Sequence, residues 1–195
     1  MCSLDTPEVC YAHVPEQLVR YANELADTSM ADHPELLAAG DHAADQVRRC
    51  ATALGRPRPE MLIAAARLHL VGHVPDIVKT GFAPVDGAVY LLGLGWPDPV
   101  VSLVGHQLQA RMVARYLGDG PQLSLITRIQ GWPADILDFA ILTSCPTGTR
   151  TVGEGLEALR RAQEADDRIP ARVREERLTR LLRAGRRVDE ALTVQ

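Results

Sequence analysis

Two histidines of this chain are spaced so that a helix could present them together to a metal ion. His69 and His73 are four residues apart, which puts two imidazole rings on one helical face, as in several zinc sites. Gly72 and Pro75 indicate that the helix is already ending there, which would spoil this spacing. His42 could join His69 as a second weak ligand. Alternatively, His42 and His69 are buried histidines that hydrogen-bond to their neighbours.

Four further polar residues are candidates for a binding pocket. Asp86 stands at a predicted helix start, where a carboxylate can cap amide groups, and contact with a ligand is the alternative. His106 could donate to an anionic ligand and Arg111 could add positive charge, or each could be an ordinary, partly buried polar residue. Asp138 is expected to act as a cap or in a salt bridge.

Helices must position all of these residues, because helical periodicity dominates from residue 15 onward and no segment alternates convincingly as a strand. The pattern predicts a single all-α domain over residues 13–185, with loose tails at 1–12 and 186–195. The run 59–71 is apolar nearly all round, which is typical of a central, buried helix. The predicted helices span residues 15–26, 34–54, 59–71, 85–94, 98–117, 133–143, 152–163 and 170–184.

The composition is that of a globular protein, with 195 residues of which 46% are hydrophobic. A net charge of −4, with arginines interspersed among Asp and Glu, gives no reason to expect nucleic acid as a partner. No apolar run approaches the roughly 20 residues that span a bilayer, and no secretory signal is visible. We therefore expect a cytoplasmic protein with no membrane partner. Its cysteines show no zinc-ribbon spacing and are expected to be inert free thiols: Cys2, Cys10, Cys50 and Cys145.

Five motifs, in the right order, resemble the HD-domain superfamily of metal-dependent phosphohydrolases over about residues 34–161. Asp41-His42-Ala43-Ala44 resembles the family's first histidine. Ala66-Arg67-Leu68-His69-Leu70-Val71-Gly72-His73 resembles its Leu-His-Asp signature. The other three motifs are similar to those of one bacterial branch, and they lie at residues 80–88, at 104–111, and at 137–143 with the following Pro146-Thr147-Gly148. The resemblance implies a bacterial protein with an HD-domain-like helical bundle.

The departures from the family pattern fall on the metal ligands. Leu70 stands in place of the aspartate of the His-Asp pair, and Ile141 in place of the last aspartate ligand, while Ala83 and Gln107 replace histidines. A divalent hydrolytic site needs anionic oxygen ligands to offset the charge of the metal. Replacing a carboxylate by leucine removes that charge and places a methyl group against the ion. We therefore expect no cofactor and no ordinary HD reaction.

Three functions remain open, and no catalytic residue is assigned. The first is a pseudoenzyme that binds a small molecule or a protein partner without metal-dependent phosphohydrolysis. The second is a biosynthetic enzyme with changed, metal-independent chemistry, in a pocket that Leu70 and Ile141 make more apolar. The third is a residual hydrolase that holds a divalent metal on His42, His69 and a carboxylate borrowed from Asp138. Homo-oligomerisation is open in each case.

Overall fold

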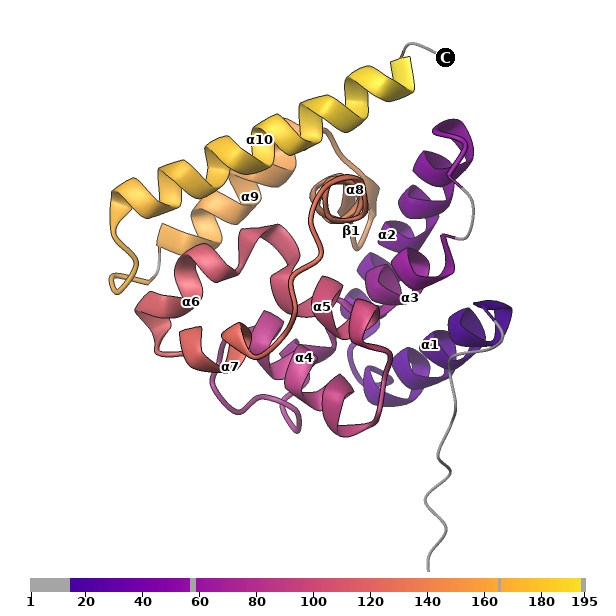
Figure 1. Cartoon of the computed structure of the whole chain (residues 1–195), viewed down its shortest axis with the longest axis horizontal. Coiled ribbons are helices and arrows are strands. Elements are labelled where there is room, and N and C mark those ends of the chain that lie inside the picture. Colours follow the sequence, from indigo (N-terminus) through magenta and orange to yellow (C-terminus); the bar gives the residue numbers. More distant parts are fainter. Residues whose placement is uncertain (1–14, 57–58, 165, 194–195) are drawn as a thin grey trace, which may run out of the picture.

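The computed structural model describes residues 15–56, 59–164 and 166–193, and over these ranges the fold is the predicted all-α bundle. Figure 1 shows helices throughout, and the strands of the described part are one antiparallel pair, β1 (Ser144–Cys145) and β2 (Gly148–Thr149). The predicted N-terminal tail, residues 1–12, lies outside the described residues.

Ten α-helices and two 3-10 helices make up the described bundle. Proline occupies the first turn of α2, α4, α5 and α8, where its missing N–H and fixed φ suit a helix start. In chain order the helices are α1 (Pro15–Ser29), α2 (Pro34–Ala53), α3 (Glu60–Leu68), η1 (Val71–His73), α4 (Ala83–Gly93), α5 (Asp98–His106), η2 (Gln107–Gln109), α6 (Arg111–Leu117), α7 (Gly120–Ser124), α8 (Trp132–Leu142), α9 (Val152–Glu164) and α10 (Ala171–Thr193).

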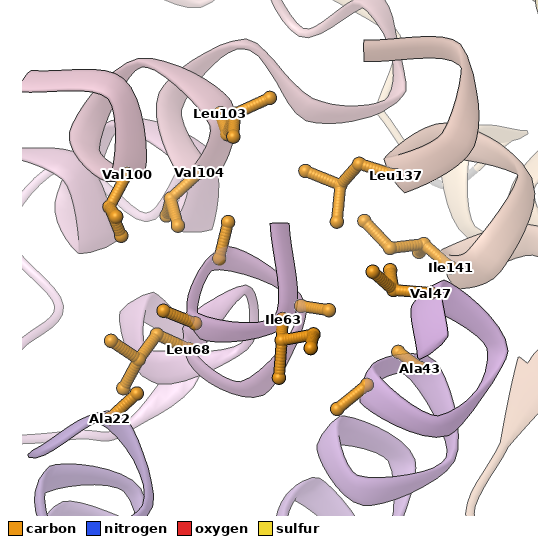
Figure 2. Close-up of a cluster of buried hydrophobic side chains, with 14 of the residues drawn as sticks. Ala22, Ala43, Val47, Ile63, Leu68, Val100, Leu103, Val104, Leu137 and Ile141 are labelled. Atoms are coloured by element: carbon orange, nitrogen blue, oxygen red, sulfur yellow. The ribbon is translucent and has the colours of Figure 1, made fainter. Parts of the chain in front are cut away.

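Helix α3 is the centre of the core, as its apolar sequence predicts. Figure 2 shows Ile63 and Leu68 of α3 surrounded by side chains from other helices, among them Ala22 of α1 and Val47 of α2. Helices α5 and α8 also contact α3. Burial on all sides explains why this segment has no polar face.

The C-terminal helix α10 packs along α8 and α9, as Figure 1 shows for the long yellow helix at the top. The predicted loose tail at 186–195 is therefore wrong over 186–193, which continue α10. Val188 is fully buried and Leu192 packs against the core. The charged residues between them hid this apolar face, because they point to solvent on the other side of the helix.

The predicted continuous helix over 98–117 is also wrong, because the chain breaks at η2. Leu108 (φ 48°) and Gln109 (φ 56°) adopt left-handed conformations, which cost non-glycine residues on the order of 1 kcal/mol each. Two buried side chains from other helices hold the break. Asp138 Oδ1 accepts the N–H of Leu108 at 2.6 Å, and Arg177 Nε donates to the Leu108 carbonyl at 2.6 Å. We call these two contacts the Leu108 clamp.

Two smaller expectations can be followed in the described ranges. Cys50, which is buried, and Cys145, which is partly exposed, are free thiols as predicted, whereas Cys2 and Cys10 lie outside the described residues. None of the helices in the described ranges is both long enough and apolar enough to cross a bilayer.

Candidate functional site

A cavity of about 310 Å³ opens between the C-terminal end of α3, the start of α4, η2 and helices α6, α8, α9 and α10. Four of the predicted pocket residues line it together: His69, Leu70, His73 and Ile141. Leu70 and Ile141 are 71 positions apart in the sequence, yet they face the same space. The two positions at which the HD resemblance implies aspartates thus supply apolar wall.

His69 is the buried polar residue at the floor of this cavity, with only 4% of its surface exposed. Its Nδ1 lies 2.6 Å from the Ala66 carbonyl. A carbonyl only accepts, so Nδ1 carries the proton and Nε2 is left as an acceptor. Burial lowers the pKa of His69 to about 4, although the bond to Ala66 opposes this shift. The ring is therefore neutral at neutral pH.

The lowered pKa of His69 predicts that acid removes the contribution of this residue to stability. The folded ring takes up a proton only near pH 4, whereas the unfolded ring does so near 6.5. Between these values the unfolded state binds more protons, so the stability contributed by His69 is lost as pH falls from about 6.5 to 4. In urea unfolding at pH 7, 5.5 and 4.5, His69→Gln should lose stability less steeply than the wild type. Parallel pH profiles would contradict the shift.

The helical spacing of His69 and His73 is not preserved. Helix α3 ends at Leu68, and His73 closes the separate 3-10 helix η1, where it is exposed at the cavity rim. Gln107, also on the cavity wall, donates its Nε2–H to the His69 carbonyl at 2.7 Å. The Gln107 amide therefore fixes the backbone of His69.

His42 and Asp86 lie outside the cavity lining. The His42 Nδ1–H donates to the carbonyl of Cys145 at 2.8 Å, which ties α2 to β1. Asp86 does not cap the start of α4 as predicted, but holds the preceding loop: it accepts from Thr80 N–H at 2.9 Å and Gly81 N–H at 3.0 Å. Both residues thus hold backbone close to the cavity.

Asp138 also lies outside the lining, one helical turn before Ile141, and is 2% exposed. Its carboxylate serves the Leu108 clamp and also accepts from Gln109 Nε2 at 3.4 Å. Burial raises the pKa of Asp138 to about 7, despite the hydrogen bonds from Leu108 and Gln109 and the nearby charge of Arg177. This carboxylate caps a strained turn and does not face the cavity.

The residues at the cavity do not fit the metal centre that the HD resemblance implies. His69 offers one ring nitrogen and His73 lies at the rim, whereas Gln107 donates to backbone and the Asp166 carboxylate is paired with Arg168. Leu70 and Ile141 offer no donor. Across the described ranges, no three His, Cys, Asp or Glu side chains gather as a metal site would require. Hard divalent ions need several oxygen ligands, so this donor set cannot hold one.

His106 and Arg111 lie together, but in a different hollow. His106 Nε2 is 3.0 Å from the Ile126 carbonyl, so that nitrogen carries the proton and donates. Burial lowers the pKa of His106, and the charges of Arg128 and Arg111 lower it further. The neutral ring thus has an acceptor, Nδ1, and not the predicted donor, left for a ligand.

Four polar residues of the cavity lining are missing from the sequence-based set: Gln163 of α9, Arg177 of α10, and Asp166 and Arg168, which lie between these helices and pair with each other at 2.7 Å. Gln163 is 6% exposed, and neither its Oε1 nor its Nε2 has a hydrogen-bond partner. Arg177 is buried as well, and burial lowers its pKa to about 10. A signal for Gln163 was present, because it follows Leu156 and Leu159 on the apolar face of α9.

Comparisons of the chain with protein-family models, curated proteins and solved structures found no match. The likeness to the HD-domain superfamily therefore rests on the sequence motifs. What the geometry adds is the character of the site, an apolar cavity with one buried histidine at its floor and an unpaired amide in its lining.

Proposed function

We propose that this protein is a catalytically degenerate HD-domain-like protein that binds a small organic molecule in the cavity at His69, without metal-dependent phosphohydrolysis. The observation that carries the proposal is the meeting of Leu70 and Ile141 on one cavity wall. A single lost aspartate could leave a weakened metal site. Two apolar replacements facing the same space make a surface that favours contact with apolar organic groups over binding of cations.

The size and lining of the cavity support an organic ligand. Its volume of about 310 Å³ lies at the lower end of the roughly 300–1,000 Å³ typical of small-molecule pockets. The remaining walls are largely apolar, with a few polar groups that could fix an orientation, as binding pockets commonly have. The apolar side chains that contribute most are Phe82, Leu108, Val113, Leu117, Leu159 and Ile169.

The unpaired amide of Gln163 indicates one chemical feature of the ligand. A buried polar group without a partner costs about 1–3 kcal/mol, and here a donor and an acceptor are both unpaired. A ligand with an N–H beside a C=O, such as a lactam or the edge of a nucleobase, would pair with both atoms of the amide. The proposed ligand is therefore a compact, mainly apolar molecule with one amide-like edge.

Filling the cavity should abolish binding of an apolar probe. N-phenyl-1-naphthylamine, which fluoresces strongly in apolar surroundings, should bind the wild-type protein saturably with one site per chain. Ala162→Trp places a large ring at the cavity lining from an exposed position on α9 and should weaken binding at least tenfold. Ala171→Trp, exposed at the start of α10 and outside the lining, is the matched control. Equal binding by both variants would contradict the proposal.

Restoring the two carboxylates should create the metal site that the proposal holds to be lost. Protein purified without chelator should carry no stoichiometric iron, manganese or zinc, and should not hydrolyse phosphodiesters or nucleotides. The double variant Leu70→Asp, Ile141→Asp should take up a divalent metal, because two anionic oxygen donors then join His69. Stoichiometric metal with turnover in the wild type would overturn the proposed function.

A further inference from the structure

Two adjoining hollows, outside the cavity at His69, gather much of the positive charge of the chain. They have volumes of about 640 and 580 Å³ and share Gln109, Arg128 and Arg180 as lining. Together they are lined by seven arginines and by three carboxylates, those of Asp135, Glu176 and Glu190. We call this surface the arginine groove. Its excess of cations stands out in a chain whose net charge is −4.

The carboxylates of the groove leave several arginines unpaired. Glu176 pairs with Arg180 at 2.5 Å and Asp135 with Arg187 at 2.8 Å. Arg111, Arg183 and Arg186 also line the groove. None of these three side chains makes a hydrogen bond or an ion pair to another described residue. These guanidinium groups are available to an anion, and their planar forks match phosphate oxygens.

The buried ring of His106 is an independent indication of a ligand. It lines the same hollow as Arg111 and Arg128 and is 8% exposed. Its Nε2–H is used by the Ile126 carbonyl, while its buried Nδ1 has no partner. Buried polar atoms are nearly always paired. We therefore expect this nitrogen to accept a hydrogen bond from a donor that the described protein does not supply.

We propose that the arginine groove binds a small molecule that carries phosphate groups. Phosphate oxygens would accept from Arg111 and Arg128, and a protonated phosphate oxygen would donate to His106 Nδ1. A phosphate group has its second pKa near 6 and so offers an O–H as well as anionic oxygens. A carboxylate offers no such proton at neutral pH. Phosphate is therefore the common anion that can both accept from Arg111 and Arg128 and donate to His106 Nδ1.

The carboxylates make a nucleic acid the poorer occupant. A long phosphate backbone would run past Glu190, and it would have to displace Glu176 and Asp135 from their arginines. The net charge of the chain would repel it further. A compact molecule can instead sit among Arg111, Arg128 and His106, away from Asp135 and Glu190, which line only the other hollow.

Isothermal titration with inorganic pyrophosphate at pH 6 tests the groove. The wild type should bind pyrophosphate at least tenfold more tightly than sulfate, and should also prefer inorganic phosphate to sulfate, which has the same tetrahedral geometry as phosphate but no proton to donate. Arg111→Gln and Arg128→Gln should each weaken pyrophosphate binding about tenfold. Arg172→Gln removes the same charge from an exposed position on α10 outside the groove and should have no effect.

Three results would overturn the proposal. The first is equal affinity for sulfate and pyrophosphate, and the second is an equal loss in Arg172→Gln. The third is tighter binding of a single-stranded oligonucleotide than of pyrophosphate. The cavity variant Ala162→Trp should leave pyrophosphate binding unchanged, so the groove and the cavity at His69 are tested separately.

Discussion

Replacing Gly72 by alanine should strongly destabilise the fold. A Cβ at this position would lie 2.0 Å from the Ala83 carbonyl oxygen and 2.6 Å from the Gly87 nitrogen. Both are backbone atoms of α4, so no side-chain rotation can relieve the clash, and η1 must separate from α4. We expect a loss of about 4 kcal/mol or more, a large share of the 5–15 kcal/mol that stabilises a typical domain. The melting temperature, followed by circular dichroism, should fall by about 8 °C or more.

Gly153 provides the control for this experiment. It lies inside α9, and the nearest atom to an added Cβ is the Thr151 hydroxyl at 3.9 Å. Alanine is favoured over glycine within a helix by up to about 1 kcal/mol. Gly153→Ala should therefore melt at the same temperature as the wild type or higher. If Gly72→Ala had the same melting temperature as Gly153→Ala, η1 and α4 would not be packed as closely as described.

Asp138→Ala should be the second most damaging substitution. It removes the acceptor of the Leu108 N–H and takes the nearby negative charge away from buried Arg177. The left-handed turn at η2 then loses one half of the Leu108 clamp. We expect a loss of about 2–4 kcal/mol in urea unfolding at pH 8. Binding of N-phenyl-1-naphthylamine should weaken as well, because Leu108 lines the cavity.

Asp138→Asn separates the hydrogen bond from the charge. Its side-chain oxygen can still accept from Leu108, so we expect less than half of the loss seen with alanine. The pH profile should differ too. The pKa of Asp138 is about 7 in the fold against an ordinary value of 3.8. The folded state then holds a proton that the unfolded state releases, so the stability contributed by Asp138 declines as pH rises from about 4 to 7, opposite in sign to the contribution of His69. Asp138→Asn should lack this decline. If its stability depended on pH as that of the wild type does, the raised pKa of Asp138 would be contradicted.

The fold was largely predictable, because most helices carry a clear apolar face. The run 59–71 reads as a buried central helix and is one up to Leu68. The errors come from contacts remote in sequence. Nothing local to 98–117 shows that Asp138 and Arg177 bind the peptide of Leu108. Likewise, α10 continues past Val188 because this side chain is buried in the core, which the local sequence does not show.

The candidate site was predictable in part, for the same reason. The motif resemblance led to His69, Leu70 and Ile141, which share one cavity. It also grouped His106 with them, whereas the break at η2 leaves His106 in the arginine groove. Gln163 was missed because α9 reads as a charged surface helix, although the spacing of Gln163 from Leu156 and Leu159 places it on the apolar face of that helix.

The break at η2 has a consequence for the energy landscape of the chain. The residues from 98 to 117 favour one uninterrupted helix by local pattern, and the fold denies it to them through the Leu108 clamp. Such disagreement between local preference and global structure is local frustration, which natural proteins concentrate where function requires it. Here the frustrated residues are Leu108, in the wall of the cavity, and Gln109, in the wall of the arginine groove. An isolated peptide of residues 98–117 lacks the Leu108 clamp, so its helix should continue through Leu108 and Gln109.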